Sequence, residues 1–384
     1  MNAAMLMLCL TGSAVGQPGE TVFKAPGIEV RTETRDDKTY SYLLYNRVYM
    51  GRQYHSTKAE PTLNRLPTTY FHDKSPIGIV LKDAKSFPKK AEPPVAVLGM
   101  DVGTLAAYAQ PGQTFHFTER VPTFVKLSLP EKGKPIFTFV QDALDRGAKV
   151  KIFEGEPRAM LEKHGPDKFY KVIVIETYKL PVIDIHKELL TKEALQMLMS
   201  KLTDDGIVCF HTSNRYYQMA PIIASAANEL KLACIVGRDM PDFNDRKDDF
   251  RFSSEWVMVA RSGKHLAHLK KDESNRVEWG EPMLRHIGRG KFIEAKIDKQ
   301  FLWTDKGEQS FRGLYNSDPD IDKLQDTLRD VEQFFNESVG IGPRGTSQVS
   351  RSISEILRAW SRSSAEQKNR ESPLKTKDKA GEKK

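Results

Sequence analysis

A glycine-bracketed turn and an acidic residue form the most informative pattern in the chain. The turn runs from Gly99 to Gly103 (GMDVG) and follows a short apolar run, and Glu119 ends the next apolar run. A glycine turn lets a ligand approach the backbone closely, and an acid about twenty residues further on can hydrogen-bond both hydroxyls of a ribose. The pair therefore predicts a nucleoside site.

Two further acids follow later apolar runs. Glu156 comes just after residues 149–154 and could accept a hydrogen bond from the exocyclic amine of an adenine. Glu176 ends residues 171–176 and could act as a base or hold a cationic substrate. A single acid in such a place is commonly a charge in the first turn of a helix. Acids at three consecutive run ends fit that explanation less well, so we expect them to line one site.

A parallel sheet would bring these residues together. Short apolar runs alternate with helical segments, and strands that are covered on both faces and joined by helices predict a doubly wound, mostly parallel sheet. In such sheets ligands sit at the carboxyl ends of the strands. Thr191 is the expected N-cap of one helix, with Asp205-Gly206 as its stop. The expected strands are residues 95–98, 114–119, 149–154, 171–176, 206–211, 233–237 and 255–261, and the expected helices are 104–109, 191–202, 220–230 and 320–336.

The N-terminal part has a different pattern. Residues 27–52 contain aromatic and β-branched runs separated by turn formers, which predicts three short antiparallel strands. A proline-rich break at residues 87–94 follows. The expected domains are an apolar, flexible N-terminus (1–20), a small β subdomain with its connector (21–90), a Rossmann-like domain (91–340) and a disordered basic tail (341–384).

Charge and composition exclude several classes of protein. The net charge is +8, but residues 361–384 hold eight Lys/Arg and four Asp/Glu and so carry +4 of it, which argues for a solvated tail and against a nucleic-acid partner. Three separated cysteines predict neither disulfides nor a metal site. No apolar run is long enough for stable membrane insertion. Residues 1–10 lack the basic start of a signal peptide, so a cytoplasmic protein is expected, with export left open.

Several segments together resemble the polyamine aminopropyltransferases (spermidine synthases), especially their bacterial spermidine-synthase-like members. The resemblance covers about 270 residues and implies the fold of the class I S-adenosylmethionine-dependent methyltransferases. Homodimers occur among these enzymes, so the resemblance implies a possible homodimer. The matching segments are LLYNRVYMGRQY, RLPTTYFHDKSPIGIVL, LGMDVGTLAAYAQPGQTFHFTERVP, FEGEPRAML, YKVIVIETYKLPVIDIHKELLTKEAL, LTDDGIVCFHTSNRYY and LWTDKG.

The resemblance implies a role for each candidate site residue. Decarboxylated S-adenosylmethionine, or S-adenosylmethionine itself, would be the co-substrate, and no metal would be required. Glu176 stands where the family has the aspartate that binds and helps deprotonate the attacking amine, and Tyr178 follows it as a second catalytic candidate. The implied cofactor-binding residues are Gln53, Tyr70, Gly99, Asp101, Gly103, Glu119 and Glu156.

The chain departs from the family pattern at the places where the family does its chemistry. Asp101 replaces the central glycine of the turn, and Glu156 and Glu176 each replace an aspartate. Lys179 lies in the segment that matches the gatekeeping loop and would repel a polyamine. Three hypotheses therefore stay open: aminopropyl transfer to a polyamine such as putrescine, methyl transfer from S-adenosylmethionine, and a catalytically silent relative that binds a nucleoside or acts as a scaffold.

Overall fold

The computed structural model describes residues 19–46, 48–82, 94–129, 134–176, 187–213, 218–239, 241, 250–271, 277–280 and 301–307. The chain divides into two compact units, of which the first holds Met1–Leu284 and Ile293–Leu314. Every described residue belongs to this first unit. The predicted helix at residues 320–336, the tail at 341–384 and the proline-rich residues 87–93 lie outside the described residues.

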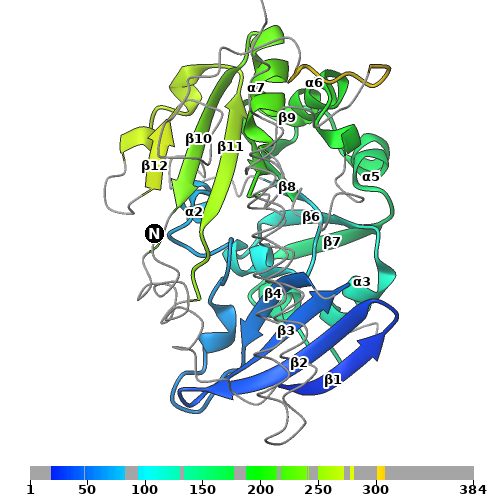
Figure 1. Ribbon diagram of the computed structural model, residues 1–384, viewed down its shortest axis with the longest axis vertical. Coiled ribbons are helices and arrows are strands. Elements are labelled where there is room, and N and C mark those ends of the chain that lie inside the picture. The colour runs from blue at the N-terminus through cyan, green and yellow to red at the C-terminus, as the bar shows by residue number, and fades with distance from the viewer. Residues whose placement is uncertain are drawn as a thin grey trace, which may run out of the picture. The chain divides into compact units, whose positions relative to one another are not determined.

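The N-terminal segment forms an antiparallel sheet of four strands in chain order (Figure 1). Two of its turns are made by residues with positive φ, at Asp36 and Asp37 (φ 50 and 61) and at Asn46 (φ 47), a conformation that Asp and Asn tolerate. The predicted strands are present, and β1 is an additional, largely exposed edge strand that lacks a clear apolar alternation. The strands are β1 (Glu20–Ala25), β2 (Ile28–Arg35), β3 (Lys38–Tyr45) and β4 (Val48–Tyr54).

The larger sheet has eight strands in the order β12-β10-β11-β9-β8-β5-β6-β7. Strands β5 to β9 pair in parallel, while β11 is antiparallel to both β9 and β10, and β12 is antiparallel to β10. The expected doubly wound, mostly parallel sheet is thus confirmed, with antiparallel strands toward one edge. The strands are β5 (Val95–Leu98), β6 (Thr114–Glu119), β7 (Lys149–Glu154), β8 (Tyr170–Glu176), β9 (Leu202–His211), β10 (Ala233–Asp239), β11 (Ser254–Ala260) and β12 (Val277–Gly280).

The chain changes direction across this sheet at β5. From β5 it builds β6 and β7 on one side, and it then returns to build β8 and β9 on the other. The two connections leave β5 in opposite directions, and in sheets of this kind ligands commonly bind at the carboxyl end of such a strand. The glycine turn that follows β5 therefore lies at the switch point.

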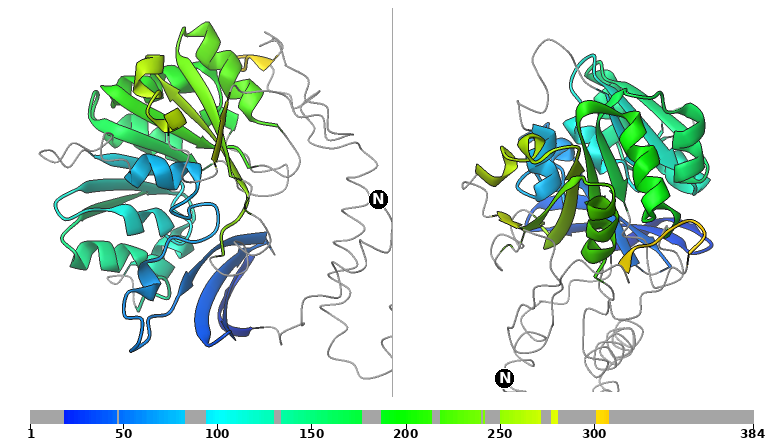
Figure 2. Two further views of the ribbon diagram at one scale, coloured as in Figure 1. Left: turned by 90° about the vertical axis from the view of Figure 1, so that its left-hand side faces the viewer. Right: turned by 90° about the horizontal axis from the view of Figure 1, so that it is seen from above.

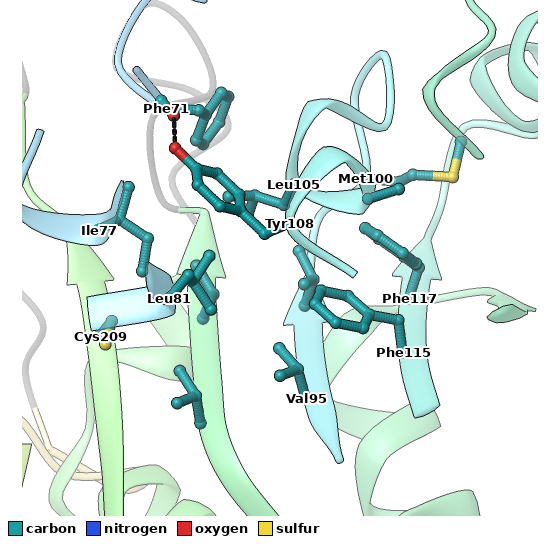
Figure 3. Packing of buried hydrophobic residues seen from close by; sticks show 14 of the residues in the cluster. Phe71, Ile77, Leu81, Val95, Met100, Leu105, Tyr108, Phe115, Phe117 and Cys209 are labelled. Carbon is teal, nitrogen blue, oxygen red and sulfur yellow. Dashed lines mark hydrogen bonds between the residues drawn. The ribbon is translucent and has the colours of Figure 1, made fainter. Parts of the chain in front are cut away.

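Helices cover both faces of the eight-stranded sheet (Figure 2). Successive residues of β5 show the two faces, because Val95 and Val97 join one apolar cluster while Ala96 and Leu98 join the other. The first cluster also includes Phe71, which precedes the sheet in sequence. The Tyr108 hydroxyl donates to the carbonyl of Phe71 at 2.6 Å (Figure 3). The α-helices are α2 (Pro76–Lys82), α3 (Pro122–Ser128), α4 (Phe139–Asp145), α5 (Pro157–His164), α6 (Lys192–Lys201) and α7 (Ala220–Glu229).

Helix α6 begins as predicted but ends earlier. The Thr191 hydroxyl accepts the Ala194 N–H at 3.1 Å, which confirms the cap. The predicted stop at Asp205-Gly206 is wrong, because α6 ends at Lys201 and β9 begins at once with Leu202. The Leu202 side chain is fully buried, and this burial favours a strand that starts four residues before Gly206.

The predicted helix at residues 104–109 is instead a short 3₁₀ helix, η2 (Thr104–Tyr108). It starts from Gly103, whose backbone is left-handed (φ 78), and leads straight into extended backbone at Ala109. One turn is too short to complete an α-helical hydrogen-bond ladder. Among the described residues no helix is long and apolar enough to cross a membrane.

Candidate functional site

The register of the central strands places Gly99 between two acids. Leu98 of β5 lies opposite Thr118 of β6 and Ile175 of β8, so the residues that follow them, Gly99, Glu119 and Glu176, stand at one level. Hydrogen-bonded strands lie about 4.8 Å apart, so the three residues occupy neighbouring strand ends. The carboxyl edge at the switch point thus carries a carboxylate on each side of the glycine turn.

Glu119 is fully buried and bonded to the main chain. Its Oε2 accepts the N–H of Met100 at 2.9 Å and that of Asp101 at 3.3 Å, and its Oε1 accepts the N–H of Val121 at 2.9 Å. The side chain therefore holds the glycine turn against the end of β6. Both of its oxygens are engaged by the protein itself, an arrangement that the sequence did not reveal.

The backbone of the turn explains why glycine flanks it. Gly99 and Gly103 have φ values of 101 and 78, in the region that side chains disfavour. A Cβ on Gly103 would also stand 2.9 Å from a methyl carbon of Val140. Asp101 adopts a left-handed conformation as well (φ 52), and only 3% of its surface is exposed. Asp101, at the position where the resemblance implies a glycine, thus adopts a backbone conformation that glycine favours.

Glu156 lies one strand further along the same edge. It is the exposed N-cap residue of α5, and its side chain makes no capping hydrogen bond. The neighbouring Gly155 donates its N–H to the carbonyl of Glu119 at 2.8 Å. The structure therefore brings the Glu156 turn beside Glu119.

Glu176 forms a buried pair with a residue that the sequence analysis did not select. Its Oε1 lies 2.7 Å from Nδ1 of His211, and the side chains are 2% and 0% exposed. The two residues are opposite each other in the parallel pairing of β8 and β9. The His211 ring stacks on Trp256 with centroids 4.5 Å apart, and the Tyr70 ring lies 5.0 Å away. Aromatic rings therefore flank the acid–imidazole pair.

His211 also connects to a serine. Its Nε2 lies 2.8 Å from Oγ of Ser213, and Ser213 Oγ accepts the N–H of Glu255 at 2.7 Å. The sequence does contain a signal for this pair, because His211 ends the predicted strand that follows the one ending in Glu176. The ends of parallel strands meet at one edge of a sheet. Pairing could not be inferred without the register of β8 and β9.

The remaining predicted site residues are divided between two places. Tyr70 joins the pair through its ring contact with His211, as described above. Gln53 is buried elsewhere: its Oε1 accepts the N–H of Thr138 at 2.6 Å, and its Nε2 donates to the carbonyl of Asn64 at 2.8 Å. These bonds join β4 to the start of α4 and do not include Glu119 or Glu176. Tyr178 lies outside the described residues, as does Lys179.

A segment near the end of the described chain, residues 301–307, supports the helix that follows Glu156. Arg158 donates to both carboxylate oxygens of Asp305 at 2.8 Å, and the Thr191 hydroxyl donates to the same carboxylate at 2.7 Å. Hydrogen bonding from Arg158 lowers the pKa of Asp305 to about 2. Trp303 in this segment is almost completely buried. The segment thus fixes α5 to the N-terminus of α6.

In the described part of the chain, no group of three or more His, Cys, Asp or Glu side chains is arranged to hold a metal ion. Glu119 instead faces backbone amides, and Glu176 faces an imidazole. The arrangement can hold hydrogen-bond donors such as ribose hydroxyls or a protonated amine, and it can accept a proton at Glu176.

Comparison with solved structures finds likenesses of low sequence identity. A probable spermidine synthase from Corynebacterium glutamicum has a TM-score of 0.45 and 11% identity, with 78% of this chain and 98% of that chain covered. The spermidine synthase from Thermotoga maritima has a TM-score of 0.37 and 11% identity over 63% and 73% of the two chains. A predicted O-methyltransferase from Agrobacterium tumefaciens has a TM-score of 0.30 and 14% identity over 47% and 78%.

The chain resembles spermidine synthases. These likenesses are distant, however, and the fold class rests on the strand order and directions described above. A scan against protein-family models finds no match, and a search of curated protein sequences finds none either.

Proposed function

We propose that the protein transfers an aminopropyl group from decarboxylated S-adenosylmethionine to a polyamine acceptor such as putrescine. The observation that supports this most directly is the buried Glu176–His211 pair at the switch point, one strand away from the glycine turn. A carboxylate in that place can hold an ammonium group and accept its proton. The likeness to spermidine synthases agrees with the proposal but does not carry it.

The cofactor would lie along the strand ends from β7 to β5. Gly99 and Gly103 would admit its sulfonium side, Glu119 would bind the ribose, and Glu156 would face the adenine amine. Ribose binding requires the Glu119 carboxylate to exchange at least one of its backbone amides for a ribose hydroxyl. Asp101 would sit near the aminopropyl portion, where its negative charge attracts the primary amine of the decarboxylated form and repels the carboxylate of intact S-adenosylmethionine.

The reaction needs the acceptor amine to lose a proton before or during attack. The nitrogen lone pair attacks the methylene carbon bonded to the sulfonium, the carbon–sulfur bond breaks, and its electrons remain on sulfur in methylthioadenosine. Glu176 takes the proton from the nitrogen. The positively charged sulfur is already a good leaving group, so the chain has to supply orientation and a base.

A catalytically silent nucleoside-binding relative is the second candidate. The observation that favours it is the complete burial of Glu119, whose oxygens accept three backbone amides. An acid that serves only to hold a turn needs no ligand. The two candidates differ in whether a product is formed and in whether ligand binding requires Glu119.

Two measurements test the proposal. Isothermal titration with decarboxylated S-adenosylmethionine, S-adenosylmethionine and methylthioadenosine identifies the cofactor, and we expect the decarboxylated form to bind most tightly. Chromatography then follows methylthioadenosine formation with putrescine, spermidine or cadaverine as acceptor. Binding without product would favour the silent relative, and tighter binding of intact S-adenosylmethionine would favour methyl transfer.

A further inference from the structure

A directed chain of hydrogen bonds runs from the backbone of β11 to Glu176. The N–H of Glu255 donates to Ser213 Oγ at 2.7 Å, Ser213 Oγ lies 2.8 Å from His211 Nε2, and His211 Nδ1 lies 2.7 Å from Glu176 Oε1. A backbone N–H can only donate. The first bond therefore has a fixed direction, and it occupies an acceptor site of the serine oxygen.

Two acceptors among the described residues lie within reach of the Ser213 hydroxyl proton, and their distances differ. His211 Nε2 lies at 2.8 Å, whereas the carbonyl oxygen of Glu255 lies at 3.4 Å, near the limit for a hydrogen bond. The shorter distance favours donation from the Ser213 hydroxyl to Nε2. An imidazole nitrogen that accepts a hydrogen bond carries no proton. With Nε2 as the acceptor, the neutral ring carries its proton on Nδ1. The Nδ1–H then donates to the Glu176 carboxylate.

We infer that Ser213 and His211 are positioning residues that hold Glu176 as an oriented carboxylate for the reacting amine. This inference rests on the proposed aminopropyl transfer for its role in catalysis. Ser213 selects the tautomer of His211, and His211 donates to one oxygen of Glu176. Neither residue needs to touch the substrate.

The surroundings make this chain effective. Glu176 and His211 are almost completely buried, and the His211 ring packs on Trp256. A buried carboxylate depends on protein donors in place of water, and a hydrogen bond to its charged form favours that form. The imidazole N–H thus fixes the direction of the Glu176 carboxylate.

The same three residue types also occur in nucleophilic serine triads, which predicts a different role for Ser213. Here the oxygen of Ser213 already accepts the Glu255 N–H at 2.7 Å, which lowers the electron density available for attack. We therefore assign Ser213 to orientation. Covalent labelling of Ser213 by a fluorophosphonate, mapped by mass spectrometry on the full-length protein, would overturn this assignment.

The tautomer itself can be measured without any substrate. In protein labelled with ¹⁵N-histidine, long-range ¹H–¹⁵N correlation spectra report which ring nitrogen is protonated, and His211→Asn assigns the signals by removing them. We expect the Nδ1–H form in the wild type and in Ser213→Thr, which retains the hydroxyl. Ser213→Ala should shift His211 toward the Nε2–H form. A wild-type ring protonated on Nε2 alone would overturn the inference.

Kinetics then connect the tautomer to the reaction. Ser213→Ala should lower kcat about tenfold with little change in KM for the cofactor, because an oriented hydrogen bond in the chain to a charged group is lost. Ser213→Thr should restore kcat. His211→Asn keeps an N–H that can replace Nδ1–H and should retain more activity than His211→Phe.

A matched control removes a comparable bond elsewhere in the sheet. His116 of β6 lies 2.8 Å from the Tyr170 hydroxyl through its Nδ1, and Tyr170 is at the opposite end of β8 from Glu176. His116→Phe should leave kcat unchanged. Equal losses of kcat in His116→Phe and Ser213→Ala would show a general effect on folding and would overturn the positioning role. If neither the wild type nor any variant forms methylthioadenosine, the proposed function fails. The tautomer measurement still tests the hydrogen-bond chain in that case.

Discussion

The carboxylate of Glu119 accepts the main-chain N–H of Met100 at 2.9 Å, so a strand-end acid holds the turn that follows the neighbouring strand. This relationship gives Glu119 a structural role alongside any role in ribose binding. A sequence pattern alone would assign it to the ligand only. Substitution of this residue is therefore expected to affect stability as well as affinity.

Glu119→Gln should lower the free energy of unfolding by about 1–3 kcal/mol. Glutamine offers one acceptor oxygen and one NH₂ group, whereas both carboxylate oxygens accept backbone N–H groups, so one N–H would lose its partner. Urea denaturation followed by circular dichroism measures the change. The exposed Glu156→Gln is the control and should leave stability unaltered; equal stability of wild type and Glu119→Gln would contradict the buried arrangement.

Glu176→Gln should lower aminopropyl transfer by on the order of 10²–10⁴ in kcat, the scale for a lost general base, while cofactor affinity changes little. Glutamine still accepts the His211 N–H through its amide oxygen but cannot take a proton from an amine. Methylthioadenosine formation measures kcat, and calorimetry measures affinity.

Glu176→Asp tests the length of the same side chain. It restores the carboxylate that the resemblance implies, so activity should be preserved or raised if Glu176 acts as the base. The shorter side chain also lengthens the bond to His211. Absence of product in the wild type, Glu176→Gln and Glu176→Asp would rule out transfer and leave the silent relative as the leading candidate.

Asp305 should contribute a pH-dependent stability. Hydrogen bonding from Arg158 lowers the pKa of Asp305 to about 2, below the usual value near 4 for an unfolded chain. A lowered pKa in the folded state stabilises the fold at pH values above the unfolded pKa, and this stability is lost as the pH falls from about 4 to about 2. Because 37% of the Asp305 side chain is exposed, Asp305→Asn should cost only about 1 kcal/mol at neutral pH.

Thermal unfolding between about pH 2 and pH 7 checks this prediction. Asp305→Asn should lose less stability on acidification than the wild type does. Asp167, whose side chain is 72% exposed and pairs with Lys201, provides a matched surface control. If Asp167→Asn lowered the stability at neutral pH as much as Asp305→Asn does, the Arg158 contact would contribute no more than an exposed surface pair.

Cys209 should be inert in the native protein. Its thiol is fully buried in β9, and burial raises the pKa of the thiol, so the reactive thiolate is suppressed. Cys234 is only partly buried. Labelling with iodoacetamide, quantified for each cysteine by mass spectrometry, should modify Cys234 first and Cys209 only after denaturant is added; equal rates in the native protein would contradict this.

Short-range sequence patterns predicted the fold well because each strand carries its own signal. The parallel strands β5 and β8 are continuous apolar runs, and Thr191 is a strong local cap. The helix stop at Asp205-Gly206 failed because the buried Leu202 belongs to the strand, and burial is decided by tertiary packing. β1 was missed because this edge strand is largely exposed, and its residues show no regular apolar alternation.

The candidate site was harder to predict because it depends on register. Gly99, Glu119 and Glu176 were selected from their positions after apolar runs, and the sheet does place them at one edge. His211 was missed because its partner is set by the alignment of β8 with β9. Gln53 was proposed from resemblance, yet its amide is occupied by Thr138 and Asn64, contacts between residues far apart in sequence.

The place of β5 in the sheet also bears on how the chain reaches its native state. Residues 95–98 pair with residues 172–175, although two strands and their helices separate these segments in sequence. The β5–β6–β7 and β8–β9 halves can each assemble from nearer contacts, while joining them requires a long loop to close before its contacts stabilise it. We therefore expect slow refolding in which the two halves meet late, so the strand ends that carry Glu119 and Glu176 come together near the end of folding.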